Sequence, residues 1–333
     1  MNHEHPNNNP TDYAADDMLT PCEIWGRGAF LHLCFSSVGC RFRKAGYCTM
    51  CNYGAGKNIS AEEALRAINQ ALEQCREPIQ ELLLGTCGSI LDEAEMSWPT
   101  LECILTRISR ETIPTVLLET HYTTVNLQKL RRIKELLPGS EVVIEMGFES
   151  ANPYVLKHCL NKFLDLDQLA QTTALIKKAG MGVVLNVFLG APYLTLREQI
   201  DDAKNAVEWA VARGADRVVV FPANIKPNTT LWDMYQQGYY QRISHWALIE
   251  LMDRLDDAHL ERIELSWYGD RQKIGKSTAA IPPESCSDCD EAVFTFYRDF
   301  IVSFTSQERR ELLQKIKALP ICSCRKKFLA ALN

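Results

Sequence analysis

The order of elements along this chain constrains its fold more than any other feature. From residue 29 to residue 224, short apolar runs that indicate buried strands alternate with longer amphipathic stretches that indicate helices. Parallel strands need such crossovers, so the alternation predicts an α/β fold with a parallel sheet covered by helices. Six units in succession favour a partial (β/α)6 barrel. The predicted strands are 29–35, 81–84, 115–118, 142–146, 182–189 and 217–221.

Helix signals lie between these strands. Ser60 and Glu63 form a capping box that predicts a helix running to about Cys75. Right-handed crossovers bring the carboxyl ends of all the strands to one rim. Because polar or small residues follow the predicted strands, we expect the candidate site residues to face one cavity. Further helices are predicted at 127–137, up to Lys178, and at 197–212.

Length and composition suit a globular protein. The chain has 333 residues, 46% apolar and 23% charged, enough for one large domain or for one domain with an appendage. Residues 1–20 are polar and lack periodicity, which predicts a disordered tail. We assign 21–272 to the barrel. Beyond it the pattern changes, and a linker at 273–283 is predicted to open a small Cys-rich C-terminal subdomain at 273–333.

The first residues and the charge bear on compartment and partners. The chain begins Met-Asn-His-Glu-His-Pro, with no basic segment followed by an apolar one, so we expect a cytoplasmic protein with reduced cysteines. No apolar run approaches the roughly 20 residues that span a bilayer, so we expect no membrane insertion. The net charge of −6 argues against a strongly basic nucleic-acid surface, although it leaves an RNA substrate open.

Three cysteines, Cys40, Cys48 and Cys51, come soon after the first predicted strand. Their loop supplies three thiolates and no fourth, whereas a structural zinc or an electron-transfer cluster takes four protein ligands. A [4Fe-4S] cluster held by three ligands leaves one iron free, so the count predicts a catalytic cluster. The alternative is that these cysteines are simply buried or bind zinc, with Cys34 as the nearest fourth ligand.

This loop, at the end of the first strand of a partial barrel, resembles that of the radical S-adenosylmethionine (SAM) enzymes. Their usual spacing is Cys-x3-Cys-x2-Cys, and the first gap here is longer, with seven residues. Within the superfamily the chain is similar to the Elp3/MiaB-like group and, in it, to the bacterial or archaeal radical SAM lyases of archaeosine biosynthesis. The segments that carry the resemblance are 39–51, 88–92, 147–152, 159–162, 222–224, 238–240, Trp246, 286–290 and 322–324.

The resemblance implies cofactors and chemistry. It makes Cys40, Cys48 and Cys51 the ligands of a [4Fe-4S] cluster whose fourth iron chelates the amino and carboxylate groups of SAM. One electron, from a donor such as flavodoxin or ferredoxin, cleaves the sulfonium C–S bond and yields a 5′-deoxyadenosyl radical that abstracts hydrogen from the substrate. In this family a partner enzyme is a further expectation.

Positions at the strand ends are the candidate cofactor contacts. Gly88 and Ser89 end the second strand, where the superfamily grips the SAM amino group. Glu149 follows the fourth strand and is placed to take the ribose hydroxyls, and Met50 is placed against adenine. Asn186, on the fifth predicted strand, is a further candidate cofactor contact. The other polar rim residues that we expect to orient a substrate, or only to stabilise loops, are Glu119, His121, Asn224 and Lys226.

Four more cysteines stand in two pairs near the C-terminus. Cys286 and Cys289, then Cys322 and Cys324, form a closed set of four thiolates. Such a set predicts a structural zinc site, with a second iron–sulfur cluster or no metal as the alternatives. The residues 291–300 between the pairs are predicted to be helical.

Three functions follow from these residues. The first is a radical SAM enzyme, of lyase or transferase type, that performs C–N lyase chemistry in tRNA base modification. The second keeps the radical chemistry but acts on a small metabolite in a natural-product pathway. The third is a non-catalytic zinc-binding scaffold. The full-length resemblance favours the first, and the acidic charge favours the second.

Overall fold

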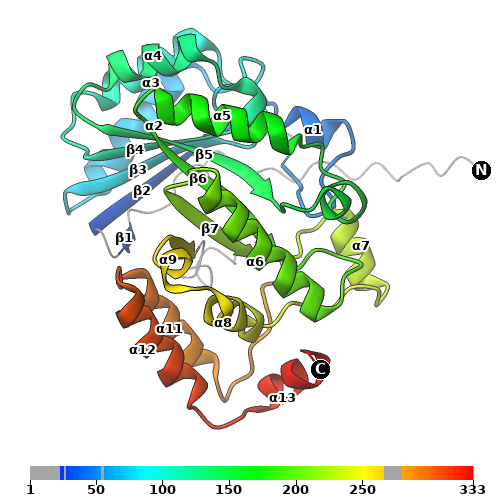
Figure 1. Cartoon of the computed structure of the whole chain (residues 1–333). Coiled ribbons are helices and arrows are strands. Elements are labelled where there is room, and N and C mark those ends of the chain that lie inside the picture. Colours follow the sequence, from blue (N-terminus) through cyan, green and yellow to red (C-terminus); the bar gives the residue numbers. More distant parts are fainter. Residues whose placement is uncertain (1–22, 26–27, 54–55, 266–279, 333) are drawn as a thin grey trace, which may run out of the picture.

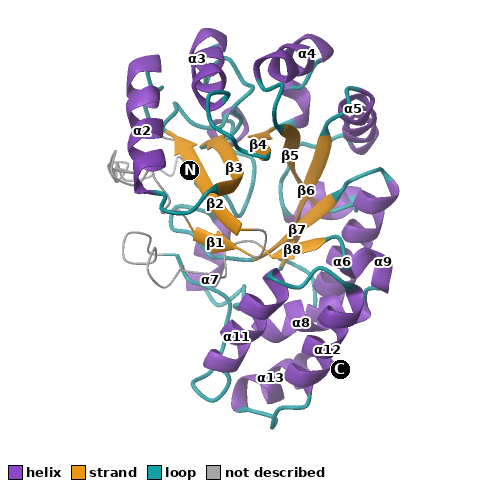
Figure 2. Ribbon diagram, turned by 90° about the vertical axis from the view of Figure 1, so that its left-hand side faces the viewer, coloured by secondary structure: helices purple, strands orange, loops and turns teal. Residues whose placement is uncertain are grey.

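An eight-stranded curved sheet forms the centre of the computed structural model, which describes residues 23–25, 28–53, 56–265 and 280–332 (Figures 1 and 2). The strand order follows the chain. The first strand pairs antiparallel with the second, and all other neighbours are parallel. The strands are β1 (Glu23–Trp25), β2 (Gly28–Phe35), β3 (Ile79–Thr86), β4 (Thr115–Thr120), β5 (Glu141–Glu149), β6 (Gly182–Leu189), β7 (Arg217–Pro222) and β8 (Ile263–Leu265).

The predicted α/β partial barrel is confirmed, with one parallel strand more than predicted. All six predicted strands are present as β2 to β7, and most extend beyond the predicted bounds. The structure adds β1 and β8, of three residues each. Three residues are too short to show the period of two that identifies a strand in a sequence.

Helices cover the outer face of the sheet, and α2 to α5 lie side by side along it (Figure 2). Reciprocal capping boxes start α2, α6 and α12 and satisfy backbone N–H groups there. The helices are α1 (Arg41–Lys44), α2 (Ala61–Gln74), α3 (Trp98–Ile108), α4 (Leu127–Leu136), α5 (Leu166–Lys178), α6 (Leu196–Ala212), α7 (Thr230–Gln236), α8 (His245–Arg254), α9 (Asp257–Leu260), α11 (Asp290–Ile301), α12 (Ser306–Lys317) and α13 (Ser323–Leu332), with short turns η2 (Tyr122–Thr124) and η3 (Val155–Cys159).

The two faces of the sheet carry different clusters of buried side chains. Side chains of the outer face pack with the helices into one large hydrophobic cluster. The inner face carries a separate small cluster whose core is Leu117, Val143, Val184 and Val219. Side chains alternate between the faces along each strand, so the next inner positions toward the carboxyl ends of β4 and β5 are Glu119 and Glu145. An apolar layer therefore lies beneath a polar one.

The C-terminal helices α11, α12 and α13 pack beside α8 (Figure 1). Their buried residues Val293, Phe300 and Phe328 belong to the same hydrophobic cluster as the barrel. The predicted helix at 291–300 is confirmed as α11. The predicted tail and most of the predicted linker lie outside the described residues. No described helix is both long and apolar enough to cross a membrane.

Candidate active site

The cysteine loop begins where β2 ends, and Cys40 caps the one-turn helix α1. At the end of β3, Gly88 packs directly on Cys40: a Cβ on Gly88 would lie 2.8 Å from the Cβ of Cys40. Any larger residue at this position would push the loop away from β3. Two of the predicted site residues, Gly88 and Cys40, are therefore in direct contact.

One side of the loop is held by a segment more than a hundred residues later. The Cys48 backbone N–H donates to the Asn161 carbonyl at 2.9 Å, and the Thr49 N–H donates to the Leu160 carbonyl at 2.9 Å. The Asn161 side-chain amide donates to the Gly46 carbonyl at 3.0 Å. Cys48 itself has a positive φ of 66°, which is uncommon for a residue with a side chain. These contacts fix the conformation of the loop around Cys48.

The other side of the loop is held by the connection between β7 and α7. The Leu231 N–H donates to the Thr49 carbonyl at 2.9 Å. The Asn52 amide donates to the Pro227 carbonyl at 3.2 Å, and Arg43 donates to the Asn228 carbonyl at 2.8 Å. We call residues 159–162 and 227–231 together the clamp. The sequence contained both segments, but nothing in it showed that they meet at the cysteine loop.

The three thiols of the loop share one electrostatic environment. Burial raises the pKa of Cys48 to about 12, while Lys162 acts in the opposite direction and the charges of Cys51 and Cys40 raise it further. Burial also raises the pKa of Cys51, against Lys226. A metal would have to displace the protons of these thiols, and the two lysines favour the thiolate form.

Among the described residues, no fourth cysteine joins this group. The nearest candidate from the sequence, Cys34, interacts with the thiol of Cys87, and this contact and burial raise the pKa of Cys34 well above its ordinary value. The three-thiolate donor set fits a [4Fe-4S] cluster with one open iron and does not fit a four-ligand zinc site.

Glu149 lies at an irregularity in the pairing of β5 with β6 and has a positive φ of 67°. Its carboxylate forms an ion pair with Lys162, which belongs to the clamp. A Cβ on Gly147 would lie 3.0 Å from Oε1 of Glu149 and 3.2 Å from Nζ of Lys162, so a side chain there would crowd the pair. The Glu149 charge also raises the pKa of Cys48, which places this carboxylate near the cysteines.

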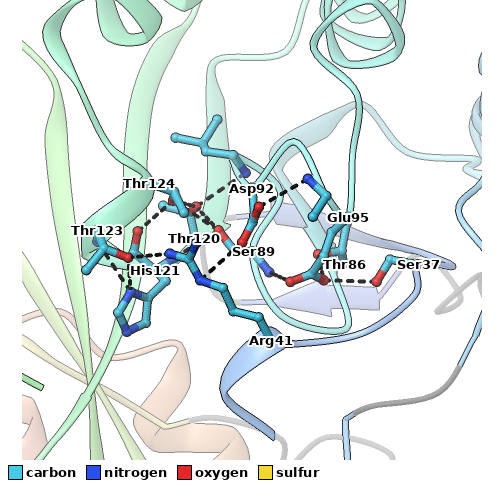
Figure 3. Close-up of polar contacts among 12 residues, drawn as sticks. Ser37, Arg41, Thr86, Ser89, Asp92, Glu95, Thr120, His121, Thr123 and Thr124 are labelled. Atoms are coloured by element: carbon cyan, nitrogen blue, oxygen red, sulfur yellow. Dashed lines mark hydrogen bonds and ion pairs between the residues drawn. The ribbon is translucent and has the colours of Figure 1, made fainter. Parts of the chain in front are cut away.

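A buried carboxylate that the sequence did not single out joins the cysteine loop to β3 (Figure 3). Glu95 is 2% exposed. It accepts hydrogen bonds from the Ser37 hydroxyl at 2.9 Å, the Thr86 hydroxyl at 3.0 Å and the Ser89 N–H at 3.1 Å. Burial raises the pKa of Glu95, and these bonds oppose the shift. Glu95 therefore connects the start of the loop with the predicted SAM segment.

The hydroxyl of Ser89 belongs to a network of short polar side chains (Figure 3). It lies 2.6 Å from the Thr120 hydroxyl and 3.0 Å from the Thr124 hydroxyl, and it accepts from the His121 N–H at 3.2 Å. Arg41, beside Cys40, donates to Thr123 at 2.9 Å. The network holds the ends of β3 and β4 in place around the loop.

The remaining predicted rim residues lie in different settings. Met50 is partly buried against the hydrophobic cluster. Burial lowers the pKa of His121 to about 3, and its Nδ1 lies 2.8 Å from the Thr123 hydroxyl. The Asn224 amide donates to the Pro222 carbonyl at 3.2 Å, as in a loop-stabilising role. The Lys226 ammonium lies 4.1 Å from the centre of the Tyr53 ring.

The four C-terminal cysteines come together as the sequence predicted. Their sulfurs all lie within 4.8 Å of one another. Successive Sγ–Sγ distances are 3.7 Å for Cys286–Cys289, 3.3 Å for Cys289–Cys324 and 3.5 Å for Cys322–Cys324. Four sulfurs at about 2.3 Å from a tetrahedral zinc ion would be about 3.8 Å apart. The donor set therefore fits one zinc ion.

The chain is similar to several archaeal proteins. No family model matches it. Archaeosine synthase subunit beta of Methanosarcina acetivorans is 25% identical over 275 residues, which cover 81% of this chain and 78% of that protein. An uncharacterized protein of Methanocaldococcus jannaschii is 23% identical over 308 residues, which cover 90% of this chain and 80% of that protein.

Among solved structures, the archaeal Elp3 of Methanocaldococcus infernus, with an N-terminal deletion, aligns with a TM-score of 0.50 and 15% identity. The alignment covers 80% of this chain and 62% of that chain, so this chain spans less than two thirds of the Elp3 structure. At this identity the likeness shows the fold alone.

The fold, the cysteine loop and the relatives all support the same resemblance. Seven parallel strands, β2 to β8, form a half-barrel, and three cysteines follow the first of them without a fourth partner among the described residues. The relatives named as archaeosine synthase subunits and the Elp3 fold match the resemblance that these motifs predicted. In its fold, its three-cysteine loop and its relatives, the chain is therefore similar to the radical SAM enzymes of the Elp3/MiaB-like group.

Proposed function

We propose that Cys40, Cys48 and Cys51 hold a [4Fe-4S] cluster and that this enzyme cleaves SAM reductively there. The observation that carries the proposal is the set of three thiols, held by the clamp at the carboxyl end of β2. When bound, the cluster and SAM supply a 5′-deoxyadenosyl radical for hydrogen abstraction. The chain's own part is to hold the cofactors and to limit what the radical meets.

Within this proposal the residues around the loop have separate tasks. Lys162 and Lys226 stabilise the thiolates by their charge. Gly88 and Ser89 stand where the SAM amino group is expected, and Glu95 sets their position through the Ser89 N–H. Glu149, turned toward the cysteines, is the proposed ribose contact, and Met50 is the proposed adenine contact. Asn186 lies farther from the loop, opposite Gly147 in the register, beside Glu145.

We further propose that the substrate is a tRNA base and that the reaction is C–N lyase chemistry. The support is the similarity along 81% of the chain to a protein named archaeosine synthase subunit beta. That name also supports a partner subunit. A flavodoxin or ferredoxin is the proposed electron donor, and the cytoplasm the proposed location. The net charge of −6 keeps a small metabolite as the second candidate substrate.

At the C-terminal cysteines we propose a structural zinc ion. The four sulfurs form a closed donor set, and Cys289, Cys322 and Cys324 are buried. This site belongs to the proposed subdomain 273–333. A scaffold in which both cysteine groups hold zinc is the competing proposal, and the three-thiolate loop argues against it.

The first experiment is anaerobic reconstitution with iron and sulfide, followed by SAM and dithionite and a mass-spectrometric assay for 5′-deoxyadenosine. We expect the wild type to form the product and Cys40→Ala to form none while remaining folded. Product from the variant at the wild-type rate would defeat the cluster assignment. A wild type that carries only zinc and forms no product would support the scaffold. With activity in hand, turnover on bulk archaeal tRNA against pooled metabolites separates the two substrates.

A further inference from the structure

Three side chains on adjacent strands form a polar layer on the inner face of the half-barrel. Glu119 of β4 is paired in register with Glu145 of β5, and Asn186 follows on β6. Neighbouring strands are about 4.8 Å apart, so carboxylates at paired positions face one another at short range. The Asn186 amide donates to Oε1 of Glu145 at 2.9 Å, which joins the third strand to the layer.

This layer has more acceptors than donors. Glu145 is 7% exposed and Asn186 is 6% exposed, and the Asn186 carbonyl oxygen is buried without a hydrogen-bond partner. The Glu119 carboxylate makes no hydrogen bond or ion pair with any residue that the structure describes. A buried acceptor left without a donor destabilises the folded state, and more so when it is charged. The layer is therefore incomplete in the protein alone.

The positively charged side chains near this polar layer do not satisfy its acceptors. Arg217 is engaged by Glu81 and Glu264, each at 3.0 Å, and Lys162 is paired with Glu149. Lys226 contributes one positive charge, which opposes the increase in the pKa of Glu119 but does not cancel it. Burial still raises the pKa of Glu119 to about 8 and that of Glu145 to about 7. Two carboxylates therefore compete for too little positive charge.

A ligand group that satisfies these acceptors must have a definite chemistry. A primary ammonium carries one positive charge and three N–H donors, and this layer offers two carboxylates and one amide oxygen as acceptors. A Ca²⁺ or Mg²⁺ ion prefers six or more oxygens, which three side chains do not provide. Glu119 is only half-buried, so a ligand reaches the layer from the carboxyl ends of the strands, the side on which the cysteine loop lies.

We propose that Glu119, Glu145 and Asn186 bind a primary ammonium group of the substrate and so orient it beneath the cysteine loop. The inference deepens the proposed function, on which it rests, since it assigns the part of the half-barrel that the substrate occupies. It makes an amine-bearing molecule the substrate class, whether that amine is attached to a nucleic acid base or to a free metabolite.

The test uses the full-length, reconstituted protein with SAM under anaerobic conditions. n-Butylammonium chloride is titrated calorimetrically, with n-butanol as the uncharged probe of the same shape. We expect binding of the amine to the wild type, binding of the alcohol weaker by about tenfold or more, and a similar loss of amine binding in Glu119→Gln. Glu141→Gln, at the exposed far end of β5, is the control and should bind the amine within about twofold of the wild type.

Each other outcome overturns the inference. Equal binding of the alcohol, unchanged binding in Glu119→Gln, equal loss in Glu141→Gln, or no amine binding to the wild type would do so, as would displacement of the amine by equimolar Mg²⁺. If Glu119→Gln does not fold by circular dichroism, Glu145→Gln takes its place. SAM cleavage in the same wild-type preparation is scored separately: product without amine binding defeats only this inference, and amine binding without product defeats only the proposed function.

Discussion

The two cysteine groups of this protein differ in how their thiols are held. The loop of Cys40, Cys48 and Cys51 is fixed by backbone hydrogen bonds from the clamp, and its three thiols remain partly exposed. The C-terminal group brings four sulfurs within 4.8 Å of one another, with Cys286 alone partly exposed. The first arrangement offers three thiols, and the second offers a closed set of four. The number of ligands and their support, rather than the abundance of cysteine, separates the proposed cluster site from the proposed zinc site.

The two cysteine groups also differ in the pKa shifts of their thiols. Burial raises the pKa values of Cys48 and Cys51. Cys286 shows the opposite shift: hydrogen bonds from the Cys324 backbone and the Ser323 side chain lower its pKa to about 6. Burial raises the pKa of Cys289 and of Cys324 in the same C-terminal group, so its thiols shift in both directions, whereas Cys48 and Cys51 of the loop shift in the same direction.

The largest expected effect separates the metals of the two groups. Cys51→Ala should reduce bound iron from about four per chain to well under one and abolish 5′-deoxyadenosine formation, while bound zinc stays near one per chain. Plasma emission spectrometry measures both metals. Cys103→Ala, which changes an exposed cysteine on α3, is the matched control and should alter neither metal. Parallel loss of iron and zinc in Cys51→Ala would show that the two groups are not independent.

Cys322→Ala should produce the reverse pattern. Removal of one of four thiolates should release zinc and lower the melting temperature by about 10 °C, because zinc binding contributes to folding. Iron content of the reconstituted protein should stay near that of the wild type. An unchanged melting temperature together with unchanged zinc would contradict the closed four-thiolate site.

Glu95→Gln tests whether the loop depends on its buried support. The substitution removes the charge that accepts three hydrogen bonds, so the initial rate of SAM cleavage should fall by about tenfold while the iron content is retained. Glu93→Gln, at an exposed position of the same turn, should change the rate by less than about twofold. Equal rates in the two variants would leave Glu95 with no positioning role.

The smallest expected effect is a change in how the melting temperature depends on pH. The unfolded chain has an ordinary glutamate pKa near 4.5, and in the folded protein that of Glu119 is about 8. The folded state therefore favours the protonated form, and this contribution to stability is lost as the pH rises from about 4.5 to 8. Between pH 6 and pH 9 the wild type should lose a few degrees of melting temperature more than Glu119→Gln does. Parallel curves for the two proteins would contradict the raised pKa.

The sequence predicts the repeating parts of this molecule better than its contacts. The strands β2 to β7 and the capping box of Ser60 and Glu63 were predicted because each is encoded within a few adjacent residues. The four C-terminal cysteines were grouped correctly from their spacing alone. Short β1 and β8 carry no such local pattern, and the structure alone supplies them.

The support around the cysteine loop was missed for a physical reason. Lys162 approaches Cys48 and Glu149 only after β2 to β5 have assembled into one sheet, in which β3 and β4 lie between β2 and β5. Glu95 and Glu145 look like ordinary surface carboxylates in the sequence, and only the folded structure shows that they are buried. Residues that act through long-range contacts have no local signal.

The clamp has a consequence for the order in which this protein matures on the ribosome. The cysteine loop is synthesised early, but one half of its support, at 159–162, emerges more than a hundred residues later, and the other half, at 227–231, later still. A nascent chain that ends before β7 contains the first half of the clamp but lacks the second, so the loop that carries the three thiols is supported on one side only. The loop is therefore complete in sequence at residue 51 but complete in structure only once the chain has been made as far as residue 231, so about 180 further residues must be synthesised before the three thiols are fully held.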